Sequence, residues 1–283
     1  MAAEMKPLIS DVREAGLMKE GYDKGRGISY RSNAFTFNRE TVVFIHGLGA
    51  ACSIWSPFEP LLEQHFNILT YDLRGHGLSQ KYDRYADYDL ECFAADLHRV
   101  LELLDIKFCT LVSHSMGTLV ALAFLRLYPG RVQRNIFISP AYMLHRVVGG
   151  NTKRLVSAAA AFLDGRPWLP TRGERMDYSR FTFSPDISAR RMIPEIRYLS
   201  LRLYLFCLAQ VYAFTADSRW SEVIVPTTIM HGTDDTFAPY GLSLDLLDVM
   251  PKASLVTVKG ANHMLVINNR STVVEVLRDG SRV

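Results

Sequence analysis

Short apolar runs alternate with longer helical patterns along the first half of this chain. The runs are rich in β-branched and aromatic residues, and each ends at a polar or glycine-containing turn; they are Thr41–Ile45, Asn67–Tyr71, Phe108–Val112 and Asn135–Ile138. Between the runs, apolar residues recur at helical spacing in Leu90–Leu104 and Met116–Tyr128. The alternation predicts an α/β fold with a mostly parallel central sheet flanked by helices.

The alternation stops after Pro140 and resumes after Trp220. Helical patterns and loops, punctuated by glycine and proline, fill the residues between them. The later strands and helices are expected at Pro226–Met230, Leu242–Met250, Ser254–Val258 and Ser271–Arg278. A helical stretch of about 80 residues between two strands is typical of an insertion into one domain. We therefore expect a core of residues 1–139 and 221–283, with residues 140–220 as a helical cap over the carboxyl ends of the strands, where open α/β sheets bind ligands.

Composition and charge narrow the class of protein. The 283 residues are 48% hydrophobic and carry 32 Lys and Arg against 29 Asp and Glu, a net charge of +3. These values are typical of a soluble globular protein, and no basic block predicts a nucleic acid partner or an anionic membrane surface. The cysteines are far apart and are expected to be buried free thiols; they are Cys52, Cys92, Cys109 and Cys207.

Nothing in the sequence predicts export or a membrane span. Met1–Gly25 contains no long apolar stretch, and we expect it to lie along the surface or to be only partly ordered. The most apolar segment, Leu199–Phe214, is interrupted by Arg202 and Gln210 and is shorter than the roughly 20 apolar residues that a membrane helix needs. We therefore expect a cytoplasmic protein without integral membrane insertion, either a monomer or a homodimer.

A serine stands at the turn between an expected strand and an expected helix, in the sequence Ser113-His114-Ser115-Met116-Gly117. An isolated Ser-x-Ser would more often be a helix N-cap. The segment also resembles the nucleophile elbow of the α/β-hydrolases, G-x-S-x-G, with Ser113 at the first glycine position. The resemblance implies an α/β-hydrolase fold with Ser115 as the nucleophile.

Two later loops resemble the acid and histidine loops of the same family. The stretch from His231 to Pro239 places Asp235 where the family has its acid, whereas its neighbour Asp234 is expected to be a turn residue. The second loop ends at His263, after Asn262 where glycine is commoner. The order of serine, acid and histidine is that of the family, so the resemblance implies a triad of Ser115, Asp235 and His263.

Two further segments resemble family loops beside the elbow. His46-Gly47-Leu48-Gly49 is similar to the H-G-x-G turn, which implies an oxyanion hole formed by the backbone amides of Leu48 and Met116, with His46 as a structural residue. Asp72–Ser79 is similar to the D-x-R-G-x-G-x-S loop and is expected to be scaffold. The resemblance covers about Thr41–Pro140 and Pro226–Leu277.

The expected cap is rich in aromatic residues. Most of them are expected to pack the cap onto the core, but some could line an acyl pocket, with Trp168, Phe206 and Tyr212 as candidates. As a group they favour a small apolar ester-type substrate. The arginines of this region are scattered and are expected on solvated faces; they are Arg154, Arg166, Arg172, Arg175, Arg180, Arg190, Arg191, Arg197 and Arg202.

The resemblance implies a carboxylesterase-type serine hydrolase that acts on short to medium acyl chains. No metal-binding or dinucleotide motif is present, so no cofactor or metal is expected. Thioesters, lactones and the C–C bonds of ring-fission diketones remain alternative substrates, because the same triad can cleave them. A small-molecule receptor with little turnover is the alternative outside the enzymes, since fold alone does not decide function.

Overall fold

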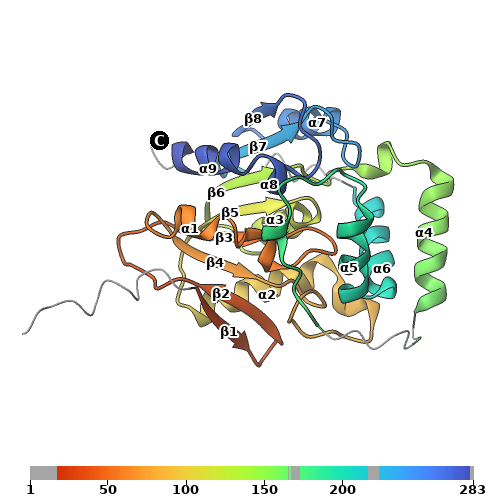
Figure 1. Ribbon diagram of the computed structural model, residues 1–283, viewed down its shortest axis with the longest axis horizontal. Helices are drawn as coiled ribbons and strands as arrows, with labels where there is room; N and C mark the ends of the chain where they lie inside the picture. Colours follow the sequence, from red (N-terminus) through yellow and green to blue (C-terminus); the bar gives the residue numbers. More distant parts are fainter. Residues whose placement is uncertain (1–17, 165, 167–172, 216–222, 281–283) are drawn as a thin grey trace, which may run out of the picture.

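The computed structural model describes residues 18–164, 166, 173–215 and 223–280 (Figure 1). Its centre is one eight-stranded sheet in the order β1-β2-β4-β3-β5-β6-β7-β8. The strands are β1 Lys19–Asp23, β2 Ile28–Ser32, β3 Thr41–Ile45, β4 Asn67–Tyr71, β5 Cys109–His114, β6 Val132–Ile138, β7 Thr227–Gly232 and β8 Ala253–Val258. All neighbours from β4 to β8 pair in parallel, which confirms the predicted mostly parallel sheet.

The sequence predicts no strand among the N-terminal residues, which are expected to lie along the surface; residues 1–17 lie outside the described part of the chain. Lys19–Asp23 is a strand that pairs antiparallel with β2, and β2 pairs antiparallel with β4. The strand lies at the edge of the sheet and is mostly exposed, so it lacks the apolar run that marks the central strands. The turn between the two strands includes Gly27 at a φ of 63°, a conformation that glycine adopts without steric cost.

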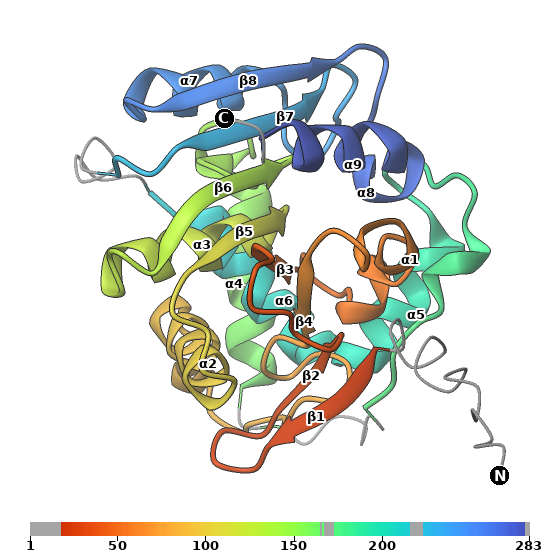
Figure 2. The same ribbon diagram turned by 90° about the vertical axis from the view of Figure 1, so that its left-hand side faces the viewer.

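Helices cover both faces of the sheet (Figure 2). The helices of the core are α1 Glu59–Leu62, α2 Leu90–Leu103, α3 Met116–Leu127, α7 Gly241–Val249, α8 Leu265–Asn268 and α9 Arg270–Asp279. Side chains of α2, α3 and α7, such as Leu97, Leu119 and Leu246, belong to one buried apolar cluster. Side chains of α1 and α9, such as Leu62 and Val273, belong to a second cluster. The two clusters hold the strand ends, and the loops that follow them, in fixed positions.

Between β6 and β7, the described residues form the helices α4 Gly150–Leu163, α5 Ala189–Leu199 and α6 Leu201–Ala213 and the short 3₁₀ turns Leu144–Arg146 and Tyr178–Arg180. Figure 1 shows these helices beside the ends of the strands toward which the arrows point. Leu203 and Cys207 of α6 belong to the same buried cluster as side chains of α2 and α3. The carboxyl ends of the strands are therefore covered by a helical layer.

Candidate active site

Ser115 lies at the sharp turn between β5 and α3 with a φ of 53° and a ψ of −123°, which is unusual for a residue with a side chain. The turn closes because the following backbone passes very near β3: a Cβ on Gly117 would lie 2.6 Å from the carbonyl oxygen of His46. Ser113, at the position where the family has glycine, is fully buried, and its hydroxyl lies 3.5 Å from that of Thr118. A small polar residue therefore fits this place.

The three predicted triad residues come together in space. The Nε2 atom of His263 lies 2.9 Å from the Ser115 hydroxyl, and its Nδ1 atom lies 2.7 Å from Oδ2 of Asp235. Because Nδ1 faces a carboxylate, the imidazole proton belongs on Nδ1, and Nε2 is left to accept a proton from the serine. Ser115 follows β5, Asp235 follows β7 and His263 follows β8, so the parallel strands place all three at one edge of the sheet.

Asp235 is buried and accepts four hydrogen bonds. Its Oδ1 accepts from the amides of Phe237 at 2.9 Å and Ala238 at 2.7 Å, and its Oδ2 accepts from His263 and His231. Burial would raise the pKa of this carboxyl, but the hydrogen bonds from His231 and His263 outweigh burial and hold its pKa well below the ordinary value. Asp235 is therefore an anion in this position.

His231 is a supporting residue that the sequence reasoning did not identify. Its Nε2 lies 3.0 Å from Oδ2 of Asp235 and 2.7 Å from the carbonyl oxygen of Ala238, while its Nδ1 lies 2.5 Å from the Ser243 hydroxyl. Two acceptors face Nε2, so the proton belongs there and the Ser243 hydroxyl donates to Nδ1. By contrast, Asp234 is exposed, and within the described residues its carboxylate accepts a hydrogen bond only from the hydroxyl of its neighbour Thr233, at 2.8 Å.

The turn after β3 places Gly47 and Leu48 at the cavity that Ser115 and His263 also line. His46 donates from Nδ1 to the carbonyl oxygen of Gly47 at 2.8 Å, while its Nε2 accepts from the amide of Leu73 at 3.0 Å. Burial lowers the pKa of His46 to about 4, so this ring is neutral. In a trans peptide the N–H points away from the carbonyl, so fixing the Gly47 carbonyl also fixes the direction of the Leu48 amide. Met116 is the first residue of α3, where backbone amides have no partner within the helix.

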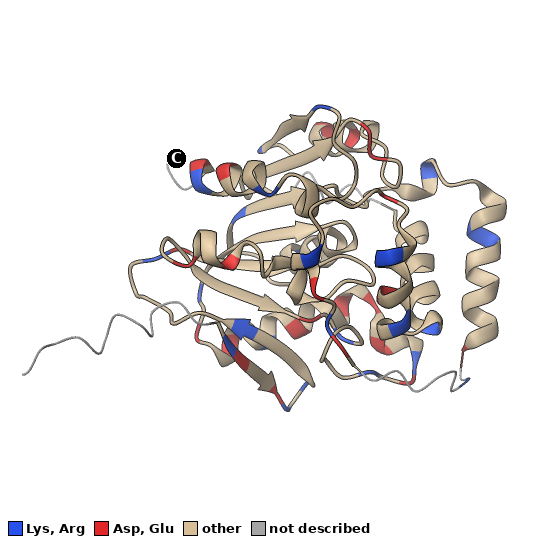
Figure 3. Cartoon of the chain, viewed as in Figure 1, with Lys and Arg blue, Asp and Glu red and all other residues tan. Residues whose placement is uncertain are grey.

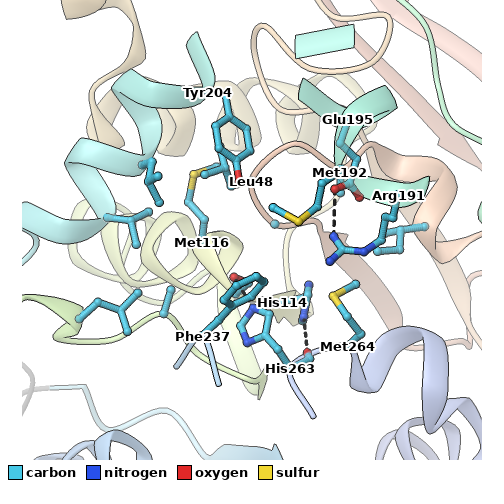
Figure 4. Close-up of a pocket in the computed structure, with 18 of the residues that line it drawn as sticks. Leu48, His114, Met116, Arg191, Met192, Glu195, Tyr204, Phe237, His263 and Met264 are labelled. Atoms are coloured by element: carbon cyan, nitrogen blue, oxygen red, sulfur yellow. Dashed lines mark hydrogen bonds and ion pairs between the residues drawn. The ribbon is translucent and has the colours of Figure 1, made fainter. Parts of the chain in front are cut away.

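A cavity of about 350 Å³ opens above Ser115 and His263 (Figure 4). Leu48 and Met116 line it from the core, and Tyr204, Leu208 and Tyr212 line it from α6. Of the three aromatic candidates, Tyr212 therefore lines the cavity, and its contact with a substrate stays a prediction. Phe206 does not line this cavity but stacks on Tyr85 with ring centroids 4.0 Å apart, and Trp168 lies outside the described residues.

A buried ion pair also lines the cavity, and the sequence reasoning missed it. Arg191 donates to Glu195 at 2.9 Å and to the Ser184 hydroxyl at 3.1 Å, and Glu195 also accepts from the Tyr178 hydroxyl at 2.8 Å. Figure 4 shows the guanidinium beside His114 on one side of the cavity. The expectation of solvated arginines is therefore wrong for Arg191. It is also wrong for Arg175, which is largely buried and pairs with Asp72 at 2.8 Å, a partner 103 residues away in the sequence. The one available signal for Arg191 was its i, i+4 spacing from Glu195.

His114, which precedes the serine, also lines the cavity. Its Nε2 donates to the carbonyl oxygen of His263 at 3.0 Å, and burial lowers its pKa to about 3, so the ring is neutral. Within the described part of the chain, its Nδ1 has no hydrogen-bond partner. The ring therefore anchors the histidine loop by one nitrogen only.

The described residues contain no group of three or more His, Cys, Asp or Glu side chains arranged to hold a metal ion. None of the described helices has the length and the apolar character that crossing a bilayer requires.

Comparisons with known proteins show the family and the fold of the chain. The chain is 27% identical over 251 residues to "Putative carbamate hydrolase RutD" of Stutzerimonas stutzeri, an alignment that spans 84% of this chain and 90% of that protein. Among solved structures, bromoperoxidase from Bacillus anthracis is similar with a TM-score of 0.71 at 21% identity, over 90% of this chain and 95% of that one. A thermophilic esterase from Thermogutta terrifontis is similar with a TM-score of 0.68 at 20% identity, over 94% and 98%. Residues 42–276 match the alpha/beta hydrolase family, and this match, together with the eight-stranded sheet, shows that the chain belongs to that family of hydrolases.

Proposed function

We propose that the chain is a serine hydrolase that cleaves carboxylic esters of short to medium acyl chains through an acyl-Ser115 intermediate. The observation that carries this proposal is the pair of hydrogen bonds that links Ser115 to His263 and His263 to Asp235, beside a cavity that Ser115 and His263 line. Each of the three side chains has the partner that its role in such chemistry requires.

The proposed reaction has two halves. The Ser115 hydroxyl attacks the ester carbonyl while Nε2 of His263 accepts its proton, and the imidazolium then protonates the leaving alcohol. Water next attacks the acyl-serine, with His263 again accepting the proton, and this step releases the acid and restores the serine. Asp235 keeps the proton of the resting imidazole on Nδ1 and stabilises the imidazolium in both halves.

The developing oxyanion needs hydrogen-bond donors in both halves. We assign this role to the amides of Leu48 and Met116, which belong to cavity-lining residues on either side of Ser115. Loss of one such donor typically costs about 2.7 to 4 kcal/mol in the barrier. The hydrogen bond from His46 to Gly47 supports the assignment, because it fixes the peptide that carries the Leu48 amide.

The cavity suggests the size and polarity of the substrate. A volume of about 350 Å³ lies near the lower end of the range of about 300 to 1,000 Å³ that is typical of small-molecule sites, which supports a short or medium ester. Its walls are mostly apolar, with Arg191 and Glu195 as a polar edge. In this proposal residues 140–220 form the cap that gives the cavity its finite length.

Carbamates are a second candidate substrate class, favoured by the name of the relatives at 25 to 27% identity. The same steps would form a carbamoyl-Ser115 and release an alcohol. Because the carbamoyl group is less electrophilic than an acyl group, its hydrolysis would be the slower half.

The test is a series of p-nitrophenyl esters from acetate to palmitate, with p-nitrophenyl N-methylcarbamate alongside, measured on the wild type and on Ser115→Ala. We expect a rate optimum at short or medium acyl chains that is abolished in the variant. A carbamate rate above every ester rate would select the second candidate. If the folded wild type hydrolyses none of these compounds and does not react with a fluorophosphonate probe, the proposed hydrolysis is refuted and the receptor alternative is favoured.

A further inference from the structure

Asp186 is a buried carboxylate at the edge of the site that has no part in the proposed hydrolysis steps. It lies between the 3₁₀ turn Tyr178–Arg180 and α5, in the segment inserted between β6 and β7. Only 6% of its surface is exposed. A carboxylate is rarely buried to this extent unless it is hydrogen-bonded, so its partners show what it holds together.

Those partners belong to the two loops that carry His263 and Asp235. Oδ1 of Asp186 accepts from the backbone amide of His263 at 2.8 Å. Oδ2 accepts from the backbone amide of Thr236 at 2.9 Å and from the Thr236 hydroxyl at 2.6 Å. Thr236 directly follows Asp235, so one carboxylate bridges the acid loop after β7 and the histidine loop after β8.

Neighbouring residues hold this bridge in place. The carbonyl oxygen of Ser184 accepts from the side-chain amides of Asn262 at 3.0 Å and Asn268 at 2.8 Å, and the Ser184 amide donates to Oδ1 of Asn268 at 2.8 Å. Arg191 donates to the backbone carbonyl of Asp186 at 2.6 Å. The presence of Asn262, where the family more often has glycine, thus adds a bond between the histidine loop and the inserted segment.

We propose that Asp186 is a positioning residue that holds His263 within reach of both Ser115 and Asp235, so that the inserted segment takes part in assembling the catalytic groups. This inference rests on the proposed serine hydrolase function. Asp186 does not replace Asp235 as the acid, because it binds the backbone amide of His263 and not the ring.

The physical reason lies in how the two loops are attached. Each loop follows the carboxyl end of its strand, β7 or β8, and the distance from His263 to Asp235 depends on the positions of both loops. A carboxylate that accepts from the two loops at once makes charge-assisted hydrogen bonds and fixes that distance. Displacement of a catalytic group by about 1 Å can lower the rate about 100-fold.

The decisive variant is Asp186→Asn. An amide has one accepting oxygen, so its NH₂ group must face an N–H either of His263 or of Thr236, and one side of the bridge is lost in both orientations. The matched control is Asp177→Asn, since Asp177 in the same segment also accepts from a backbone amide and a hydroxyl, those of Ser179, but contacts neither loop.

Three quantities are measured on both variants: kcat and KM for the best p-nitrophenyl ester, the thermal midpoint, and hydrogen–deuterium exchange of the amides of residues 233–238 and 259–268. For Asp186→Asn we expect kcat to fall at least tenfold with KM changed less than threefold, and exchange to accelerate in both loops. The control should match the wild type. An unchanged kcat in folded Asp186→Asn, or unchanged exchange in the two loops, would overturn the proposal.

A milder pair of variants covers the case in which Asp186→Asn does not fold. Thr236→Val removes only the hydroxyl bond to Asp186, and we expect kcat to fall two- to fivefold, whereas Thr236→Ser keeps the hydroxyl and should retain the wild-type rate. Equal rates in the two variants would contradict the bridge. The exchange measurement needs no substrate, so it tests the contact between Asp186 and the loops even if the wild type fails to hydrolyse esters, which would refute the proposed function instead.

Discussion

Replacement of Asp235 by asparagine gives the sharpest test of the proposed triad. Oδ2 of Asp235 accepts N–H groups from His263 and His231, while Oδ1 accepts two backbone amides. An asparagine that keeps its oxygen toward the two amides turns its NH₂ group toward the imidazoles. His263 must then move its proton to Nε2 to accept from that group, and a protonated Nε2 facing Ser115 at 2.9 Å cannot accept the serine proton.

The size of the effect follows from the tautomer. In serine proteases the corresponding exchange lowers kcat about 10⁴-fold, which equals about 5.5 kcal/mol in the barrier. We expect a loss of this order for Asp235→Asn. The fold should survive because the Nε2–H group of His231 keeps the carbonyl of Ala238 as its acceptor.

The assay compares Asp235→Asn with Asp234→Asn, whose side chain is exposed and contacts only Thr233 in the hydrogen bonds of the described chain. Initial rates are measured with the best p-nitrophenyl ester, and active-site concentration is taken from a fluorophosphonate titration of the wild type. Asp234→Asn should stay within twofold of the wild type. Retention of more than a tenth of the activity in Asp235→Asn, or a larger loss in Asp234→Asn, would refute the assignment of the acid.

Three further predictions concern stability. Ser115 has a φ of 53°, so the free energy of unfolding of Ser115→Gly should exceed that of Ser115→Ala by about 1 kcal/mol. The difference appears as a higher urea midpoint, and equal midpoints would show that the elbow is unstrained. Burial lowers the pKa of His46 to about 4 and of His76 to about 3, so between pH 6.5 and pH 4 these two rings bind more protons in the unfolded chain than in the folded one. The free energy of unfolding should therefore decrease as the pH is lowered through this window, by up to about 1.4 kcal/mol per pH unit for each histidine. A urea midpoint that does not change from pH 7 to pH 5 would contradict this. Arg191→Met leaves Glu195 buried without its cation and should lower the free energy of unfolding by about 3 to 5 kcal/mol. The double variant Arg191→Met/Glu195→Gln should restore most of this loss, because glutamine still accepts from the Tyr178 hydroxyl. A double variant no more stable than the single one would exclude the ion pair as the cause.

The sequence predicted those parts of the molecule that depend on local pattern. The runs at Thr41–Ile45 and Asn67–Tyr71 became β3 and β4 with the same bounds, because a strand buried on both faces must be almost wholly apolar. The helix expected over Met116–Tyr128 became α3 with its end one residue earlier. Ser115, Asp235 and His263 could be selected because each lies in a short motif that the family shares.

Sequence reasoning missed residues whose local sequence does not show the role that they take in the folded chain. His231 donates to Asp235 only because the loop after β7 folds back toward the strand. In the sequence it is simply a histidine near the end of an expected strand. The edge strand Lys19–Asp23 is exposed, so it carries no apolar signal. Asp186 has no local motif, and its partner His263 is 77 residues away. Such contacts follow from the fold and not from the pattern around each residue.

The inserted segment therefore contributes to the site in two physically different ways. Helix α6 supplies Tyr204 and Tyr212 to the cavity wall, where a substitution changes the space and contacts that a substrate meets. Asp186 instead binds the backbone of the two loops that carry the acid and the histidine. Changes of the first kind should act mainly on KM and on chain-length preference, and changes of the second kind mainly on kcat for every substrate. Exchange of the whole segment between relatives would mix the two effects, so a specificity transfer should exchange the residues of α6 and leave Ser184–Asp186 in place.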